Sequence, residues 1–151
     1  MKCWRGRREG ERGSELIELA LVLPILLFIV AGIVDFGFLF QRYEVVTNAA
    51  REGARVAVLP GYGQADVNAR VQQYLTASGL NQTPTVPPLV YGTQTLPSGL
   101  IVNTVQVTVT YPSSFSFIGP IAGMVGGSGW STLTLTATST MRSESAAAGG
   151  S

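Results

Sequence analysis

The chain has 151 residues, and its ten Lys and Arg side chains against nine Asp and Glu give a formal net charge of +1. This length fits one modest domain with an accessory segment, and the charge provides no basic stripe of the kind that binds nucleic acid. Histidine is absent and Cys3 is the single cysteine, which excludes an internal disulfide, a zinc knuckle and an iron–sulfur cluster. We therefore predict no metal site, no cofactor and no enzyme activity.

A long apolar segment follows the charged N-terminal residues. Residues 19–34 read LALVLPILLFIVAGIV, and after Asp35 the apolar segment continues to Phe40, for 22 residues in all. As a helix this segment would extend roughly 33 Å, enough to cross a hydrocarbon core of about 30 Å. We predict a transmembrane helix in contact with membrane lipid, because a chain of this size could hardly bury such a helix on all sides as a soluble protein would.

The basic residues predict how this helix is oriented. Five of them precede the helix, whereas Arg42, Arg51 and Arg55 follow it closely. The positive-inside rule then places the N-terminus in the cytoplasm and the C-terminal domain outside. Two other interpretations remain: a secretory signal peptide cleaved near Val30-Ala31-Gly32, and a plain single-span anchor.

The junction between the charged and apolar residues carries a more specific pattern. It reads Arg12-Gly13-Ser14-Glu15-Leu16-Ile17-Glu18, so a glutamate stands five places after Gly13, just inside the apolar segment. This pattern resembles the class III leader of type IV pilin-like proteins. The resemblance implies that a prepilin peptidase cuts between Gly13 and Ser14 on the cytoplasmic side and leaves the apolar helix attached.

Glu18 has a chemical reason to lie in this position. A charged group in an apolar helix costs on the order of 2.5–3.5 kcal/mol at the bilayer centre, and less near the interface. Cleavage would create an ammonium group on Ser14, which could pair with Glu18 of a neighbouring subunit. The alternative is that Glu18 merely marks the membrane boundary among the lipid headgroups, and that Gly13 belongs to a flexible linker.

Further motifs narrow the family. The sequences ELALVLP at residues 18–24 and AAREGAR at residues 49–55 are similar to TadE/TadG-like proteins of the tight-adherence (Flp, type IVc pilus) system, and residues 132–144 resemble the end of such chains. Members of this family are minor pilins or pseudopilins. The resemblance implies a structural subunit of the bacterial inner membrane or of a surface filament, which oligomerises with other pilins or pseudopilins and the pilus assembly platform.

Pro24 and Asp35 are two further candidate assembly residues in the apolar helix. Pro24 removes a backbone hydrogen bond and predicts a kink, which would suit a subunit that moves from bilayer to filament, although proline is also common in membrane helices. Asp35 is expected to be solvated at the outer interface. At greater depth it would need a basic partner such as Arg42 of a neighbour.

The remainder of the chain predicts a small exported domain with two helical stretches. Residues 41–59 continue the first helix, and its small apolar face is expected to pack on this domain or on another subunit; the face comprises Val46, Ala49, Ala50, Gly53 and Ala57. A second helix is expected over residues 64–78, ended by Gly79.

Alternation of apolar and polar residues over 104–111 and 132–141 predicts two antiparallel strands backed by a helix, and a weaker strand is expected at 89–91. Residues 112–129 between them are expected to form an apolar loop that covers the sheet edge, contacts the membrane or meets a partner. The charged residues of this domain offer no paired acid and base unless Asp66 and Glu144 converge in a cleft.

Together these patterns predict an α+β protein with a long N-terminal transmembrane helix, a short helix and an antiparallel sheet. Its expected parts are a cleaved cytoplasmic leader (1–13), the transmembrane helix and its extension (14–59), the exported domain (60–145) and a flexible tail (146–151). The function that follows is pilus assembly, and the alternative is a membrane-tethered binding module of the cell envelope.

Overall fold

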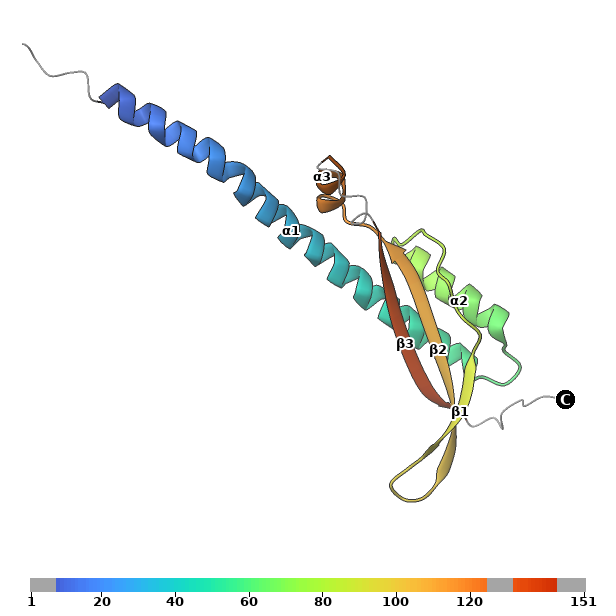
Figure 1. Ribbon diagram of the computed structural model, residues 1–151. Coiled ribbons are helices and arrows are strands. Elements are labelled where there is room, and N and C mark those ends of the chain that lie inside the picture. Colours follow the sequence, from blue (N-terminus) through green and yellow to red (C-terminus); the bar gives the residue numbers. More distant parts are fainter. Residues whose placement is uncertain (1–7, 125–131, 144–151) are drawn as a thin grey trace, which may run out of the picture.

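The computed structural model describes residues 8–124 and 132–143 of the chain (Figure 1). Within these residues the chain forms three helices and one three-stranded sheet, in the order α1 (Arg8–Ala57), α2 (Gln64–Ala77), β1 (Val90–Thr95), β2 (Ile101–Ser113), α3 (Ile118–Met124) and β3 (Leu133–Ser143). The predicted α+β class, with its short second helix and antiparallel sheet, is confirmed.

A single helix, α1, links the charged N-terminal region to the domain. Its 50 residues make a rod about 75 Å long. The helix continues through Pro24 without a break. Figure 1 shows that its N-terminal half stands clear of the sheet, whereas its C-terminal turns lie against the sheet. The predicted transmembrane helix and its predicted extension are therefore one continuous element.

The sheet has β2 at its centre, paired antiparallel with β1 on one side and β3 on the other. Asn103 lies opposite Ser143 and Ser113 opposite Leu133, so β2 and β3 pair over their full shared length. Gly99, at a φ of 82°, lies in the tight connection between β1 and β2. Antiparallel pairing of the two alternating segments, as predicted, is confirmed.

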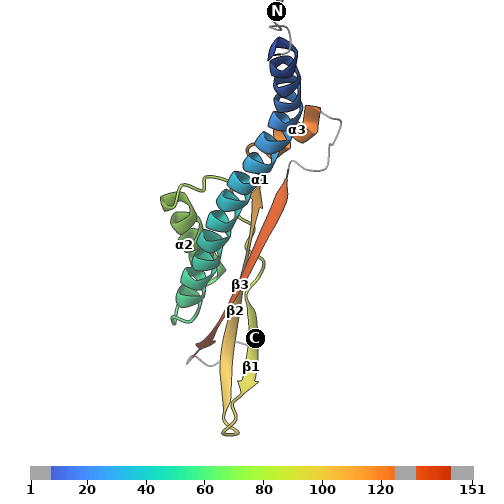
Figure 2. The same ribbon diagram turned by 90° about the vertical axis from the view of Figure 1, so that its left-hand side faces the viewer.

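The hydrophobic core lies on one face of this sheet. Helices α1 and α2 pack on that face, and Figure 2 shows α1 crossing the sheet with α2 beside it. In β2 the alternate side chains that face the helices are at most 4% exposed; they are Val105, Val107, Val109 and Tyr111. The small apolar face predicted for the end of α1 is buried in the same core.

Helix α2 begins and ends as its sequence predicts. The Asp66 carboxylate accepts the backbone N–H of Gly63 at 2.9 Å, which satisfies a donor at the helix start. Val67, Val71 and Leu75 face the core and are fully buried. Gly79 follows the helix with a φ of 83°, a conformation in which glycine is strongly favoured.

The predicted apolar loop at 112–129 is wrong in part. Pro112 and Ser113 belong to β2, and Ile118–Met124 form the helix α3, which lies beside α1 rather than over the sheet edge (Figure 1). Residues 125–129 lie outside the described residues, as do the first seven residues of the predicted leader, including Cys3, and the predicted tail at 146–151.

Candidate functional site

The segment of α1 from Leu16 to Phe40, which we call the apolar rod, has an exposed apolar surface. None of its most apolar 18-residue window is buried, and Leu21, Ile33 and Phe40 are each more than 65% exposed. An apolar surface of this size is not stable in water, and the length and composition of the helix suit it to cross a membrane. The structure is thus compatible with single-pass membrane anchoring through α1.

The predicted cleavage residues lie near the start of α1. Both Gly13 and Ser14 are exposed helical residues. A Cβ atom placed on Gly13 would meet nothing within 4 Å, so no contact in the described chain requires glycine at this position. A glycine inside a helix costs about 0.5–1 kcal/mol relative to alanine. The fold itself therefore gives no reason for this glycine.

Glu18 and Pro24 also lie on the exposed surface of the apolar rod. Within the part of the chain that the structure describes, Glu18 takes part in no hydrogen bond or ion pair. Glu18 and Asp35 lie 17 positions apart on the same helix, and the structure does not bring them together.

The environment of Asp35 differs from the one expected from the sequence. Its side chain is not solvated but only 2% exposed. Its Oδ1 accepts the backbone N–H of Ser116 at 2.9 Å, its Oδ2 accepts that of Ile118 at 2.6 Å, and both oxygens accept that of Phe117 at 3.1 and 2.9 Å. The first N–H groups of a helix have no carbonyl partner within it, and a carboxylate satisfies them well. Asp35 thus caps α3 of its own chain.

Arg42 supports the same segment from two turns further along α1. Its Nη1 donates to the hydroxyl oxygen of Ser113 at 2.9 Å and to the carbonyl oxygen of Ser114 at 2.8 Å. Because seven residues span about two turns, Asp35 and Arg42 share one face of the helix. We call this arrangement the Asp35–Arg42 clamp, since it fastens residues 113–118 to α1 at two points.

Apolar contacts complete the clamp. The rings of Phe36 and Phe115 meet edge to face, with centroids 6.3 Å apart. A Cβ on Gly32 would lie 3.8 Å from Cδ1 of Ile118, so α3 approaches the apolar rod at a residue without a side chain. The start of α3 therefore contacts α1 inside the apolar rod, not beyond its end.

A family model matches the part of α1 that contains these features. Residues 13–55 match the family model described as TadE-like protein. The matched TadE-like segment begins at Gly13, contains the apolar rod and the α1 residues of the clamp, and ends with AAREGAR. No curated protein and no solved structure matches the chain. The predicted family resemblance is confirmed over this segment.

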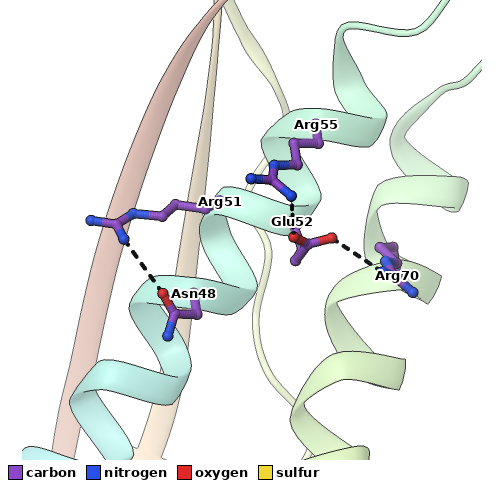
Figure 3. A network of polar contacts seen from close by, with 5 residues as sticks. All are labelled: Asn48, Arg51, Glu52, Arg55 and Arg70. Carbon is purple, nitrogen blue, oxygen red and sulfur yellow. Dashed lines mark hydrogen bonds and ion pairs between the residues drawn. The ribbon is translucent and has the colours of Figure 1, made fainter.

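The C-terminal end of the TadE-like segment carries a polar network on the outside of the core (Figure 3). Glu52 accepts hydrogen bonds from Arg55 at 2.9 Å and from Arg70 of α2 at 3.1 Å, and Arg51 contacts Asn48 at 3.5 Å. The Arg55 side chain is 69% exposed. The charges of AAREGAR thus form a solvated helix face that connects α1 to α2.

Across 8–124 and 132–143, no three His, Cys, Asp or Glu side chains lie close enough to hold a metal ion. Asp66 caps α2, and Glu144, its hypothetical catalytic partner, lies outside the described residues. The features that stand out in the TadE-like segment are thus an exposed apolar helix and a clamp that holds α3 against it.

Proposed function

We propose that this chain is a pseudopilin or minor-pilin-like structural subunit in the assembly of a tight-adherence pilus or a related secretion apparatus. The observation that carries the proposal is that the TadE-like match over residues 13–55 begins at the predicted leader glycine and covers the whole exposed apolar rod. The subunit is anchored in the bacterial cytoplasmic membrane by α1, with its N-terminus in the cytoplasm and its domain outside.

Maturation by a prepilin peptidase is part of this proposal. Cleavage between Gly13 and Ser14 removes the leader and creates an ammonium group on Ser14. Glu18 lies one turn further on and has no partner among the described residues. An unpaired carboxylate that enters an apolar environment favours a cationic partner, so the Ser14 ammonium of a neighbouring subunit would stabilise helix–helix assembly.

Sequencing the N-terminus of the protein extracted from native membranes tests the maturation step. The mature chain is expected to begin at Ser14, and Gly13→Ala is expected to block processing while the protein stays in the membrane. Gly37→Ala is the matched control, because Gly37 is another glycine of α1 whose Cβ would meet nothing within 4 Å. It should be processed normally, and a native chain that still begins at Met1 would contradict the proposal.

The assembly step has a separate test. We expect Glu18→Ala to be processed but to give a lower yield of cross-linked subunits or of filaments, because the carboxylate partner of the Ser14 ammonium is lost. Glu44→Ala removes an exposed acid from α1 beyond the apolar rod and should assemble normally. Normal assembly of the Glu18→Ala protein would remove this explanation of the carboxylate.

One observation favours the alternative, a membrane-tethered binding module of the envelope. The hairpin formed by β1 and β2 projects from the core at the end of the sheet distant from α3 (Figure 1), and it carries exposed apolar side chains; Val90, Tyr91, Leu100 and Ile101 are each at least 50% exposed. An uncleaved leader, together with full function of the Glu18→Ala protein, would support this alternative.

A further inference from the structure

We propose that Phe117 and helix α3 form a second membrane-contact element, which Asp35 holds in the outer lipid interface beside the apolar rod. The proposal rests on anchoring of α1 in a membrane. It does not depend on cleavage of the leader or on a role in a pilus.

Helix α3 approaches α1 near the outer end of a length of helix that can span a bilayer. The contact between Gly32 and Ile118 lies three residues before Asp35, inside the apolar rod. Residues 16–34 alone span about 28 Å as a helix, close to the thickness of a hydrocarbon core. A bilayer that covers these residues therefore ends about level with Asp35, and its outer boundary meets α3.

The backbone N–H groups of residues 116–118, and Ser113 and Ser114 before them, already have polar partners on α1. Backbone N–H groups that enter lipid without a partner cost several kcal/mol each, on the order of the penalty for any unpaired polar group. Here the N–H groups of residues 116–118 donate to Asp35, and Arg42 donates to Ser113 and Ser114. Throughout the described residues, every buried side-chain nitrogen or oxygen has a hydrogen-bond partner.

The side chains that Phe117 and Ile121 expose are apolar. Phe117 is 48% exposed and Ile121 is 39% exposed, and the sequence has no charged residue from position 71 to 141. On α1, Ile33 follows the glycine that approaches Ile118, and Phe36 meets Phe115; their side chains are 68% and 52% exposed. Because α3 packs beside an exposed apolar helix that is suited to lipid, a lipid interface is the occupant that fits its exposed side chains.

Fluorescence quenching from within the bilayer tests this placement. The full chain with Cys3→Ser receives one cysteine at a time, as Phe117→Cys or Ile121→Cys, and each is labelled with an environment-sensitive fluorophore. The protein is reconstituted in phosphatidylcholine and phosphatidylglycerol vesicles that carry a nitroxide on the upper acyl chain. Leu27→Cys in the apolar rod is the reference, and Thr138→Cys on the outer face of β3 is the control.

We expect labels at positions 117 and 121 to lose emission to the upper-chain nitroxide, whereas a label at 138 should lose none. A label at 27 should lose more emission to a nitroxide placed deeper in the acyl chain.

Quenching at 27 without quenching at 117 and 121 would overturn this inference alone. Absence of quenching at 27 as well would overturn both the inference and membrane anchoring by α1. If the labels at 117 and 121 are protected from water to an extent that depends on the protein-to-lipid ratio and not on the nitroxide, they contact a protein partner. That result would also overturn the inference.

A variant of the clamp tests the role of Asp35 as a positioning residue. In Asp35→Asn one side-chain oxygen is replaced by an NH₂ group that cannot accept, so the amides of residues 116–118 cannot all stay paired. We expect quenching at 121 to fall while quenching at 27 is unchanged. Asp66→Asn, which alters the equivalent capping carboxylate of α2, should change neither. Unaltered quenching at 121 in Asp35→Asn would refute positioning by Asp35.

Discussion

Gly53 of α1 lies where α2 and β2 pack closely against this helix. A Cβ atom at this position would lie 2.8 Å from a γ-methyl group of Val71 and 3.3 Å from methyl groups of Val67 and Val107. Valine side chains are stiff in a helix, so the neighbouring methyl groups cannot move away freely. The small-residue face predicted for the end of α1 thus has its reason in the two elements that pack on it.

We predict that Gly53→Ala destabilises the protein. Overpacking of a core costs about 1–3 kcal/mol, whereas the gain in helix propensity from glycine to alanine is about 1 kcal/mol. A net loss on the order of 1 kcal/mol is expected, and Gly53→Val should lose more. Thermal unfolding of the full chain in detergent, followed by circular dichroism, measures the change.

Gly37→Ala serves as the control for this prediction, because its added methyl group meets no atom within 4 Å. It should leave the unfolding temperature unchanged or raise it slightly. A Gly53→Ala protein that melts at or above the wild-type temperature would mean that Val71 can shift without cost.

Asp35 illustrates why single residues are predicted unequally well. An acid within an apolar segment indicates that its charge must be compensated, and this requirement could be predicted from the sequence. Its partners are backbone N–H groups more than 80 positions away. Because nearly every residue has a backbone N–H group, the sequence does not show which of them Asp35 binds. The sequence therefore predicted that the charge of Asp35 needs compensation, but not that the backbone at the start of α3 provides it.

At the level of elements, periodicity explains what could be predicted. The alternation in β2 and the 3.6-residue spacing in α2 each reflect burial of one face, so both elements were predictable from their own residues. Helix α3 was not, because its seven residues include two glycines and a proline and have low helix propensity. Most of β1 also lacks alternation, since all six of its residues are exposed and its pairing with β2 alone defines it.

The contact between α1 and α2 yields a prediction about which interaction stabilises it. Leu75 is fully buried, so Leu75→Ala should lower the free energy of unfolding by about 2–5 kcal/mol. The Glu52–Arg70 ion pair is partly exposed, with side-chain exposures of 22% and 42%, so Glu52→Gln should cost less than about 1 kcal/mol. Chemical unfolding of both variants in detergent compares the two. An equal or larger loss for Glu52→Gln would show that the polar network, not the apolar contact, stabilises this packing.

The orientation of the whole molecule is open to a direct measurement. A membrane-impermeant maleimide should label Ala69→Cys, on the exposed side of α2, in intact spheroplasts. In the Gly13→Ala chain, which we expect to retain its leader, Cys3 should react only after the membrane is permeabilised. The opposite labelling pattern would mean that the domain faces the cytoplasm and that the positive-inside rule fails for this chain.

The unbroken course of α1 has a consequence for the way in which this protein is made. Its last turns form one wall of the core, so α2 and the sheet have no complete surface on which to fold without them, and in the orientation proposed above these turns lie just beyond the bilayer. In that orientation we expect the domain to fold only after it has been exported. Because α1 is continuous from the apolar rod into the core, a tilt of this helix within the lipid tilts the folded domain by the same angle.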